Sequence, residues 1–242
     1  MPDANGRSLR TGSPGCGPLR GFFLQHGSPE RFDRDACVHR AGERTIYAYL
    51  LQEGWIARVR TDDAANSAFN ALHIAGDLVG VDGLPEIACD DLVALTKIAV
   101  IKLPFSTLRA GAAGDAKIGL SLADFLATET MFLREALFAV GRQPSAGRLC
   151  TFLLQTYHRL IAAGLIDGAA RQFELPLTQV ELGTALGLTS VHVNRTLKRL
   201  REQGWLEFYS GVVRIGNLEG IKRLAHSAQG HADDGSSCFS SA

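Results

Sequence analysis

The sequence predicts an α+β protein in which a strand-rich N-terminal half is followed by a long helix and a helical C-terminal part. Three observations support this class. Short runs of β-branched, aromatic and aliphatic residues follow one another between residues 38 and 104, with turn signals between them. Apolar residues then recur at helical spacing between residues 121 and 140. Residues 175–215 combine two short helical patterns with a hairpin pattern.

Composition and charge fit a globular protein with two unlike parts. The 242 residues are enough for one large or two modest domains, and 46% apolar with 21% charged residues is ordinary for such a chain. The 25 basic and 25 acidic side chains cancel, which taken alone disfavours a nucleic-acid-binding protein. The charges are unevenly placed, because residues 148–225 hold 10 basic and 6 acidic side chains. The C-terminal part is therefore basic.

The chain carries no sign of export, membrane insertion or a metal site. Residues 1–20 are rich in Gly, Pro, Ser and Arg, unlike a signal peptide, and no run approaches the roughly 18 apolar residues of a membrane helix. The five cysteines contain no CxxC pair, so neither a zinc site nor a disulfide framework is indicated. We therefore expect a cytoplasmic protein with untethered tails at residues 1–20 and 226–242.

The strand-rich half indicates a barrel or a sandwich. Short strands are predicted at residues 45–51, 55–61, 68–74 and 92–103. Successive strands without helices between them favour such a fold over βαβ units. Few residues precede Gly54, so we expect this half to be short for its class, and we expect a Gly/Ala linker at residues 111–117.

Two helices are predicted after this linker. The first covers residues 121–140, and its apolar stripe could pack on its own domain or on a partner helix. Glu129 lies on that stripe, where a solvated carboxylate at the helix edge is the simplest interpretation. The second helix follows Pro144 and stops near Gly164. Cys150, on its apolar face, is expected to be a buried small hydrophobic residue.

The most informative motif begins at residue 175 with a short helix and a turn. Thr178 and Glu181 have the T-x-x-E spacing of a capping box, which opens the helix. Gly183 is small where two helices must approach closely, and Gly187 can adopt the positive φ that a tight turn needs.

A second helix and a wing follow this turn. Thr189 can cap a helix that runs to about Gln203. Residues 205–209 and 212–215, joined by a Ser-Gly pair, have the pattern of a two-stranded hairpin. Together these parts predict a winged helix-turn-helix, with an ordinary helical hairpin as the alternative.

The second helix is predicted to enter the DNA major groove. Arg195 can bond guanine O6 and N7 bidentately, Asn194 can read adenine or contact phosphate, and Val191 offers apolar contact to a thymine methyl. The other polar residues of this helix are expected to contact phosphates, which position the protein without specifying sequence. The predicted DNA-binding residues are Thr178, Thr189, Ser190, Val191, His192, Asn194, Arg195, Lys198 and Arg199.

At this point the chain resembles the Crp/Fnr family of bacterial transcription regulators, and within it the Fnr side. LHIAGDLVGVDGL (residues 72–84) and LVALTKIAVIKLPFSTL (residues 92–108) resemble the second half of that family's sensor domain. The resemblance covers about residues 38–225. It implies a cyclic-nucleotide-binding-like β-roll (jelly roll) at residues 21–118, a dimerisation helix at 119–143 and a winged helix-turn-helix at 144–225.

The resemblance also implies partners and further sites. A homodimer would bind a palindromic operator in double-stranded DNA, with RNA polymerase as a second partner. The implied dimer interface comprises Leu122, Phe125, Leu126, Glu129, Leu133, Ala136 and Val140. The implied effector pocket, for a small molecule that the sequence does not identify, comprises Gly76, Asp77, Leu78, Val79 and Gly80. Two variants remain open: an effector-gated regulator, and a constitutive one whose roll is only a scaffold.

Departures from the family pattern exclude two cofactors from our expectation. Val81 stands where cyclic-AMP-binding members have a phosphate-cassette Glu. The Arg-Ser pair of those members aligns near Ala88 and Cys89, so the arginine that would bind a cyclic phosphate is missing. Only Cys16 and Cys37 are N-terminal, and Ile101 takes the later cysteine position, so an iron–sulfur cluster is not expected either. Val191 also replaces the recognition-helix Glu of Fnr-like members, so the half-site should differ.

Other classes of protein are weaker alternatives. A cupin-like metal enzyme needs two or three His and a carboxylate, and the strand region offers only His39 and His73. His73 is expected to be a hydrogen-bonded structural histidine. An interaction adaptor that has lost DNA binding is the other alternative. No catalytic constellation is present, so we do not expect an enzyme.

Overall fold

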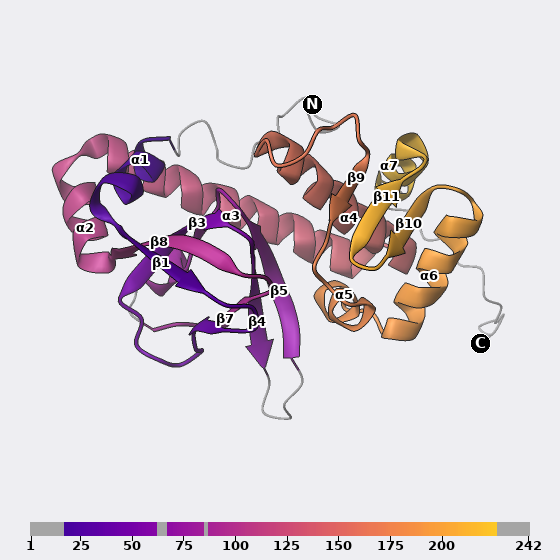
Figure 1. The fold of residues 1–242 in the computed structure, drawn as a ribbon, viewed down its shortest axis with the longest axis horizontal. Coiled ribbons are helices and arrows are strands. Elements are labelled where there is room, and N and C mark those ends of the chain that lie inside the picture. The colour runs from indigo at the N-terminus through magenta and orange to yellow at the C-terminus, as the bar shows by residue number, and fades with distance from the viewer. Residues whose placement is uncertain (1–16, 62–66, 85–86, 227–242) are drawn as a thin grey trace, which may run out of the picture.

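The computed structural model describes residues 17–61, 67–84 and 87–226. It confirms the α+β class: a strand-rich unit is followed by one long helix, α3 (Ala116–Arg142), which crosses the molecule to a C-terminal unit of helices and a small sheet (Figure 1). Within the described residues, no helix is long and apolar enough to cross a membrane.

The N-terminal unit is a sandwich of two antiparallel four-stranded sheets, as the jelly-roll class requires. One sheet has the order β1-β8-β3-β6 and the other the order β2-β7-β4-β5. The strands are β1 (Ser28–Phe32), β2 (Cys37–His39), β3 (Tyr47–Glu53), β4 (Trp55–Thr61), β5 (Ser67–Ile74), β6 (Leu78–Val79), β7 (Asp91–Ala94) and β8 (Ile98–Pro104). The expectation of a short roll is wrong, because β1 and β2 complete both sheets.

The strand predicted at residues 92–103 is in fact two strands in different sheets. The break at residues 95–97 is held by the Thr96 hydroxyl, which accepts the Trp55 N–H at 3.0 Å and donates to the Lys97 carbonyl. Gly54 is needed at this corner, because its φ is +86° and a Cβ there would lie 2.3 Å from the Lys97 oxygen. Because of this corner, β7 and β8 belong to different sheets.

Two further expectations about the N-terminal unit are corrected. The Gly/Ala linker predicted at residues 111–117 is the end of helix α2 (Phe105–Gly114) and the start of α3. Residues 17–20, assigned to the N-terminal tail, belong to helix α1 (Gly17–His26), whose Leu19 and Phe23 are fully buried. The ring of Phe22 lies against Gly111 and leaves no room for a Cβ there.

Helix α4 (Ser145–Ala162) follows Pro144 as predicted and ends before Gly164, whose φ is +70°. Its apolar face includes Cys150, which is fully buried, and this burial raises the pKa of the thiol to about 12. The prediction that Cys150 is a small buried hydrophobic residue is confirmed.

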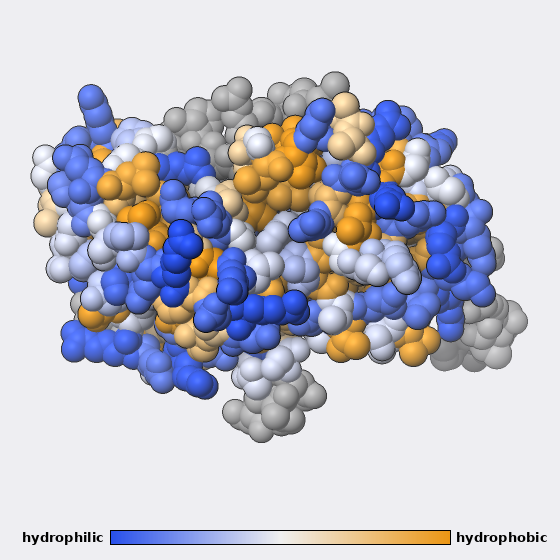
Figure 2. All heavy atoms as spheres, viewed as in Figure 1, coloured by the Kyte–Doolittle hydropathy of each residue, from blue (hydrophilic) through white to orange (hydrophobic). Residues whose placement is uncertain are grey.

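The two units share one apolar core. Leu72 and Ile74 of β5 pack in the same cluster as residues of α4 and of α5 (Gln179–Leu186). Arg159 of α4 also donates to the Leu72 carbonyl at 2.7 Å and to the Asp77 carboxylate at 2.5 Å. Apolar side chains gather over α3 and α4 in the middle of the face shown in Figure 2.

His73 of β5 is buried at this junction, with 4% exposure. Its Nδ1 lies 3.8 Å from an Asp77 carboxylate oxygen, and its Nε2 has no hydrogen-bond partner among the described residues. The expectation that its hydrogen bonds are satisfied is therefore wrong. Burial lowers the pKa of His73 well below 6.5, and Arg58 and Arg159 lower it further.

We predict that replacing His73 by Met reduces the acid sensitivity of folding. The unfolded chain protonates His73 below pH 6.5 while the folded chain keeps it neutral, so stability conferred at neutral pH is lost as the pH falls below 6.5. The slope of unfolding free energy between pH 7 and 5, from urea titrations, should drop by up to about 1.4 kcal/mol per pH unit. The exposed His26→Gln variant should keep the parental slope, and equal slopes for H73M and the parent would refute the assignment.

Candidate nucleic-acid interface

Helix α5 begins with the predicted capping box. The Glu181 N–H donates to the Thr178 hydroxyl at 3.2 Å, and the Glu181 carboxylate accepts the Thr178 N–H at 2.6 Å. Both groups would otherwise be unsatisfied at a helix N-terminus, so the pair fixes where α5 starts.

The turn after α5 depends on two glycines. Gly187 has a φ of +62° and ends the helix in the left-handed conformation. A Cβ on Gly183 would lie 2.8 Å from the Leu188 carbonyl oxygen, because the Leu188 N–H donates to Gly183 and holds the turn against α5. Gly183 thus sets how closely the turn packs on α5.

The recognition helix α6 (Ser190–Glu202) is capped by Thr189, whose hydroxyl accepts the His192 N–H at 3.3 Å. It buries Val193, Leu197 and Leu200 as predicted, and also Thr196. It lies on the outer side of the C-terminal unit (Figure 1). The nine predicted DNA-binding residues are all exposed: Thr178, Thr189, Ser190, Val191, His192, Asn194, Arg195, Lys198 and Arg199.

The charge of α6 is available to a nucleic acid. The Lys198 Nζ lies 3.9 Å from a Glu202 carboxylate oxygen. Both side chains are about two-thirds exposed, so this ion pair contributes little and leaves the lysine accessible. Arg195 and Arg199 project from the same exposed face. A helix with this charge and exposure presents its basic side chains to phosphates and base edges.

The wing is formed by β10 (Leu206–Tyr209) and β11 (Val212–Ile215). Ser210 and Gly211 both have positive φ, as a two-residue hairpin turn requires. Sequence reasoning missed the third strand, β9 (Gln172–Glu174), which pairs with β11, and the helix α7 (Leu218–His226), which packs on α4. It also missed Tyr209, 80% exposed beside the turn, whose position before the Ser-Gly pair could have marked it.

The implied dimer-interface residues lie on two sides of α3. Leu126, Leu133 and Val140 are exposed. A cavity between α3 and the rest of the same chain is lined by five of the implied residues: Phe125, Glu129, Leu133, Ala136 and Val140. Leu122 instead packs on the core of the roll. Glu129 is half-buried rather than solvated, and burial, followed by the charge of Asp77, raises its pKa.

The implied effector pocket is only partly assembled. Gly76, Asp77 and Leu78 line the same cavity, about 230 Å³ in volume, which also reaches α4 and α5. Val79 is instead buried in the core of the roll, and Gly80 lies beside the rings of His39 and Tyr49. Arg20 and Arg159, which bond the Gly76–Asp77 turn, were missed because they come from distant helices.

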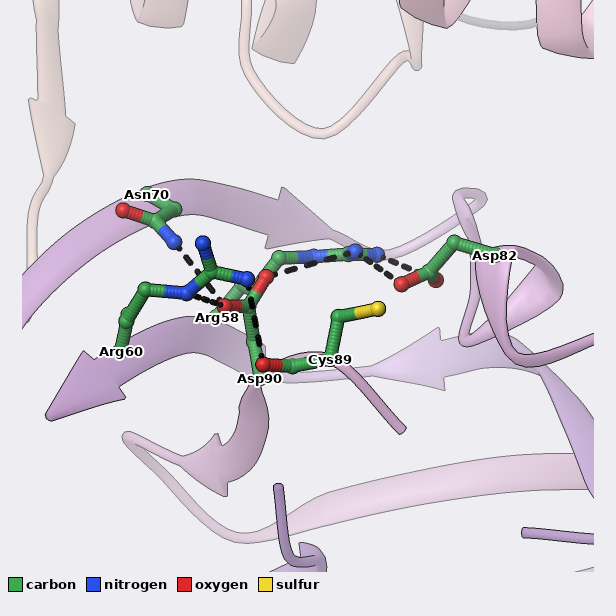
Figure 3. A network of polar contacts seen from close by, with 6 residues as sticks. All are labelled: Arg58, Arg60, Asn70, Asp82, Cys89 and Asp90. Atoms are coloured by element: carbon green, nitrogen blue, oxygen red, sulfur yellow. Dashed lines mark hydrogen bonds and ion pairs between the residues drawn. The ribbon is translucent and has the colours of Figure 1, made fainter. Parts of the chain in front are cut away.

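A network of charged side chains lies in the roll beside Val81, the position at which the resemblance implies a phosphate-cassette residue (Figure 3). Arg58 of β4 bonds the Asp82 carboxylate at 2.5 and 2.8 Å, next to the buried Val81. Arg60 donates to Asp90 at 2.7 Å, and the Asn70 amide donates to the same carboxylate oxygen. These two arginines therefore already have carboxylate partners. Among the residues the structure describes, no cluster of three or more His, Cys, Asp or Glu could hold a metal ion.

Comparison with known proteins agrees with this geometry. Residues 147–224 match the Crp-like helix-turn-helix domain. The chain is 25% identical to the anaerobic regulatory protein of Haemophilus influenzae over 188 residues, 77% of this chain and 72% of the relative. It is 24% identical to the fumarate and nitrate reduction regulatory protein of Escherichia coli K12 over 193 residues, 78% and 74% of the two chains.

The fold has solved counterparts. The structure of FixK2 from Bradyrhizobium japonicum matches with a TM-score of 0.75 and 22% identity, covering 84% of this chain and 99% of that chain. A regulator of the CRP/FNR family from Thermus thermophilus matches with a TM-score of 0.68 and 19% identity, covering 84% and 100%. The fold and the interface thus define a transcription regulator with a DNA-binding helix-turn-helix. Residues 147–224 form a Crp-like helix-turn-helix domain, and over about three quarters of its length the chain is similar to Fnr-type regulators.

We predict that Gly183→Ala destabilises the helix-turn-helix. The added methyl would press on the Leu188 carbonyl, and relieving this contact should cost about 1–3 kcal/mol in unfolding free energy, measured by urea denaturation. Gly141→Ala is the matched control, because Gly141 is also helical and a Cβ there meets nothing within 4 Å. Equal stability of the two variants would show that the close approach at Gly183 is not needed.

Proposed function

We propose that the protein acts as a homodimer that places one α6 from each chain in successive major grooves of a palindromic operator. The observation that carries this proposal is the exposed polar and basic face of α6, built on a capped helix-turn-helix with a wing. A homodimer supports a palindromic site, because its twofold axis relates two identical half-sites. The protein would act in the cytoplasm, with RNA polymerase as a further partner.

The exposed side of α3 supports the dimer. Five exposed residues follow one another along α3 at alternating intervals of four and three, and we call them the seam: Leu126, Thr130, Leu133, Leu137 and Val140. This spacing is the a/d pattern of a two-stranded coiled coil. Pairing two copies of this seam would bury the apolar side chains that a single chain leaves in water.

The proposal includes no cofactor and no catalysis. Arg58 and Arg60 are engaged by Asp82 and Asp90, so a cyclic phosphate would have to displace an internal carboxylate. Ile101 and the half-buried Cys37 do not supply the ligand set of an iron–sulfur cluster, and Cys16 lies outside the described residues.

The decisive experiment is selection of bound sequences from a random duplex pool by the purified protein without added ligand. We expect an enriched palindrome with two half-sites one duplex turn apart. An interaction adaptor without specific DNA binding would instead enrich nothing, and that result would refute the proposal.

On the selected operator, Arg195→Ala should weaken binding by about 1–3 kcal/mol, roughly 5- to 150-fold, and relax one base position. The reason is that a bidentate pair with guanine is lost. Fluorescence anisotropy measures the affinity, and repeated selection measures the preference. Arg201→Ala is the control, because Arg201 is exposed in the last turn of the same helix. Unchanged affinity and preference in R195A would remove Arg195 from base readout.

Leu137→Glu should convert the dimer to a monomer. Leu137 is 74% exposed in the single chain and lies in the seam, so pairing would bury an unpaired charge at a cost of at least about 3 kcal/mol. That cost corresponds to a roughly 100-fold weaker dimer in analytical ultracentrifugation. Met131→Glu, an exposed position on another side of α3, should stay dimeric. A dimeric L137E protein would refute the seam.

A further inference from the structure

Glu129 is a carboxylate that the single chain leaves without an ion pair. It is half-buried on the side of α3 that lines the cavity, and no described residue forms a hydrogen bond or ion pair with it. The guanidinium of Arg159 lines the same cavity, but Asp77 already binds it at 2.5 Å. Burial, followed by the charge of Asp77, raises the pKa of Glu129, although Arg159 lowers it. The carboxylate therefore lacks a cation of its own.

Glu129 lies at the border of the seam. Two seam residues, Leu133 and Val140, line the same cavity, so the cavity reaches the surface along which a second copy would lie. In the seven-residue coiled-coil repeat, with Thr130 at an a position and Leu133 at a d position, Glu129 takes a g position. Side chains at g and e flank such a seam, so the carboxylate is within reach of a second copy.

The same repeat assigns the cation. In a parallel pair, a g side chain lies beside the next e side chain of the partner helix, and opposite charges there set partner choice and orientation. The e position that follows Glu129 is Arg134, which is exposed and forms no ion pair with any described residue. The other flanking positions of α3 are uncharged: Leu120, Leu122, Ala127, Ala136 and Gly141. The flanks of α3 thus carry one acid and one base, spaced for pairing between two copies.

The interior of the seam does not fix the register by itself. Its one polar residue is Thr130, and a polar a position can specify the register of a coiled coil. The Thr130 hydroxyl, however, donates to the Leu126 carbonyl of its own helix at 2.8 Å, so it needs no partner across the seam. The remaining seam residues are aliphatic and give no directional contact. The flanking charges are therefore left to set the register.

We propose that the Glu129 carboxylate of each chain pairs with the partner's Arg134, and that these two symmetric ion pairs fix a parallel, in-register dimer. The pairing rests on the proposed function, because it specifies how the proposed homodimer assembles. A shift by one heptad would place Glu129 beside Ala127 or Gly141 instead. An antiparallel pair would bring g positions against g positions, so the opposite charges would not meet.

The pairing also reaches the junction of the two units. Glu129 lies close enough to Asp77 and Arg159 for their charges to act on it, and those two residues join the turn after β5 to α4. A second guanidinium at this place would offset the carboxylate that Arg159 leaves uncompensated. Dimer formation would therefore stabilise the place where the roll meets the C-terminal unit.

Exchange of the two charges in the full-length protein tests the proposal. Glu129→Lys and Arg134→Glu each create two like-charged pairs per dimer, so sedimentation equilibrium should show each homodimer at least about tenfold weaker than the parent. The double variant E129K/R134E restores opposite charges and should return to within about threefold of the parent.

Mixing the two single variants gives a sharper result, because only the mixed dimer has both pairs of opposite charge. With one variant labelled with ¹⁵N, native mass spectrometry should show mixed dimers well above the roughly one half that random pairing gives. Glu135→Lys and Arg142→Glu are matched controls, because both residues are exposed on the side of α3 away from the seam. These two variants should keep the parental affinity and should mix at random.

Three outcomes would overturn the pairing. They are parental affinity in both single variants, a double variant as weak as the single ones, and random mixing of E129K with R134E. If E129K does not fold, Glu129→Gln and Arg134→Gln replace it: each should weaken the dimer, and the double variant E129Q/R134Q should be no weaker than either. Additive losses in this cycle would equally overturn the pairing.

The proposed function fails by different results. A protein that dimerises and enriches a palindrome, but whose charge variants mix at random, contradicts only the ion pairs. A protein whose charge variants form mixed dimers, but which enriches no palindrome, contradicts only the proposed DNA binding.

Discussion

The contact between Asp77 and Arg159 is the interaction on which the arrangement of the molecule depends. The Asp77 carboxylate accepts the Ile74 N–H at 2.9 Å and the Arg159 guanidinium at 2.5 Å, so one side chain closes the turn after β5 and ties it to α4. The two side chains are 13% and 22% exposed, and a pair this buried is stable only while both partners are present. Leu72 and Ile74 pack beside it into the core shared with the helix-turn-helix, so charge and apolar packing join the units at the same place.

The parts of the fold that sequence reasoning predicted are those set by local interactions. The capping box at Thr178, the left-handed Gly187 and the Thr189 cap each depend on residues within a few positions, and the structure confirms all three. The break between β7 and β8 was not predictable in this way, because Thr96 meets Trp55 from 41 residues away. For the same reason the pairing of β1 with β8 and the contact of Arg20 with Gly76 needed the tertiary structure.

The candidate sites also differ in whether they depend on local or on long-range contacts. The exposed residues of α6 follow from helical periodicity once the cap is known, so the DNA-facing surface could be predicted from sequence. Glu129 could not, because its surroundings are Asp77 and Arg159 from other elements. The interior of the roll could be predicted in part. The sequence shows Val81 in place of a Glu, but only the structure shows that Arg58 bonds the neighbouring Asp82.

The position of β5 in its sheet has a consequence for how the chain can be divided. β5 is an edge strand of the order β2-β7-β4-β5, and α5 packs against it. An uncovered edge with apolar residues such as Leu72 and Ile74 is a template for pairing with another chain. The C-terminal unit therefore protects the roll from self-association. A fragment cut before α4 would also leave Leu72 and Ile74 without the C-terminal side chains that they pack against, so we expect it to aggregate where the whole chain does not.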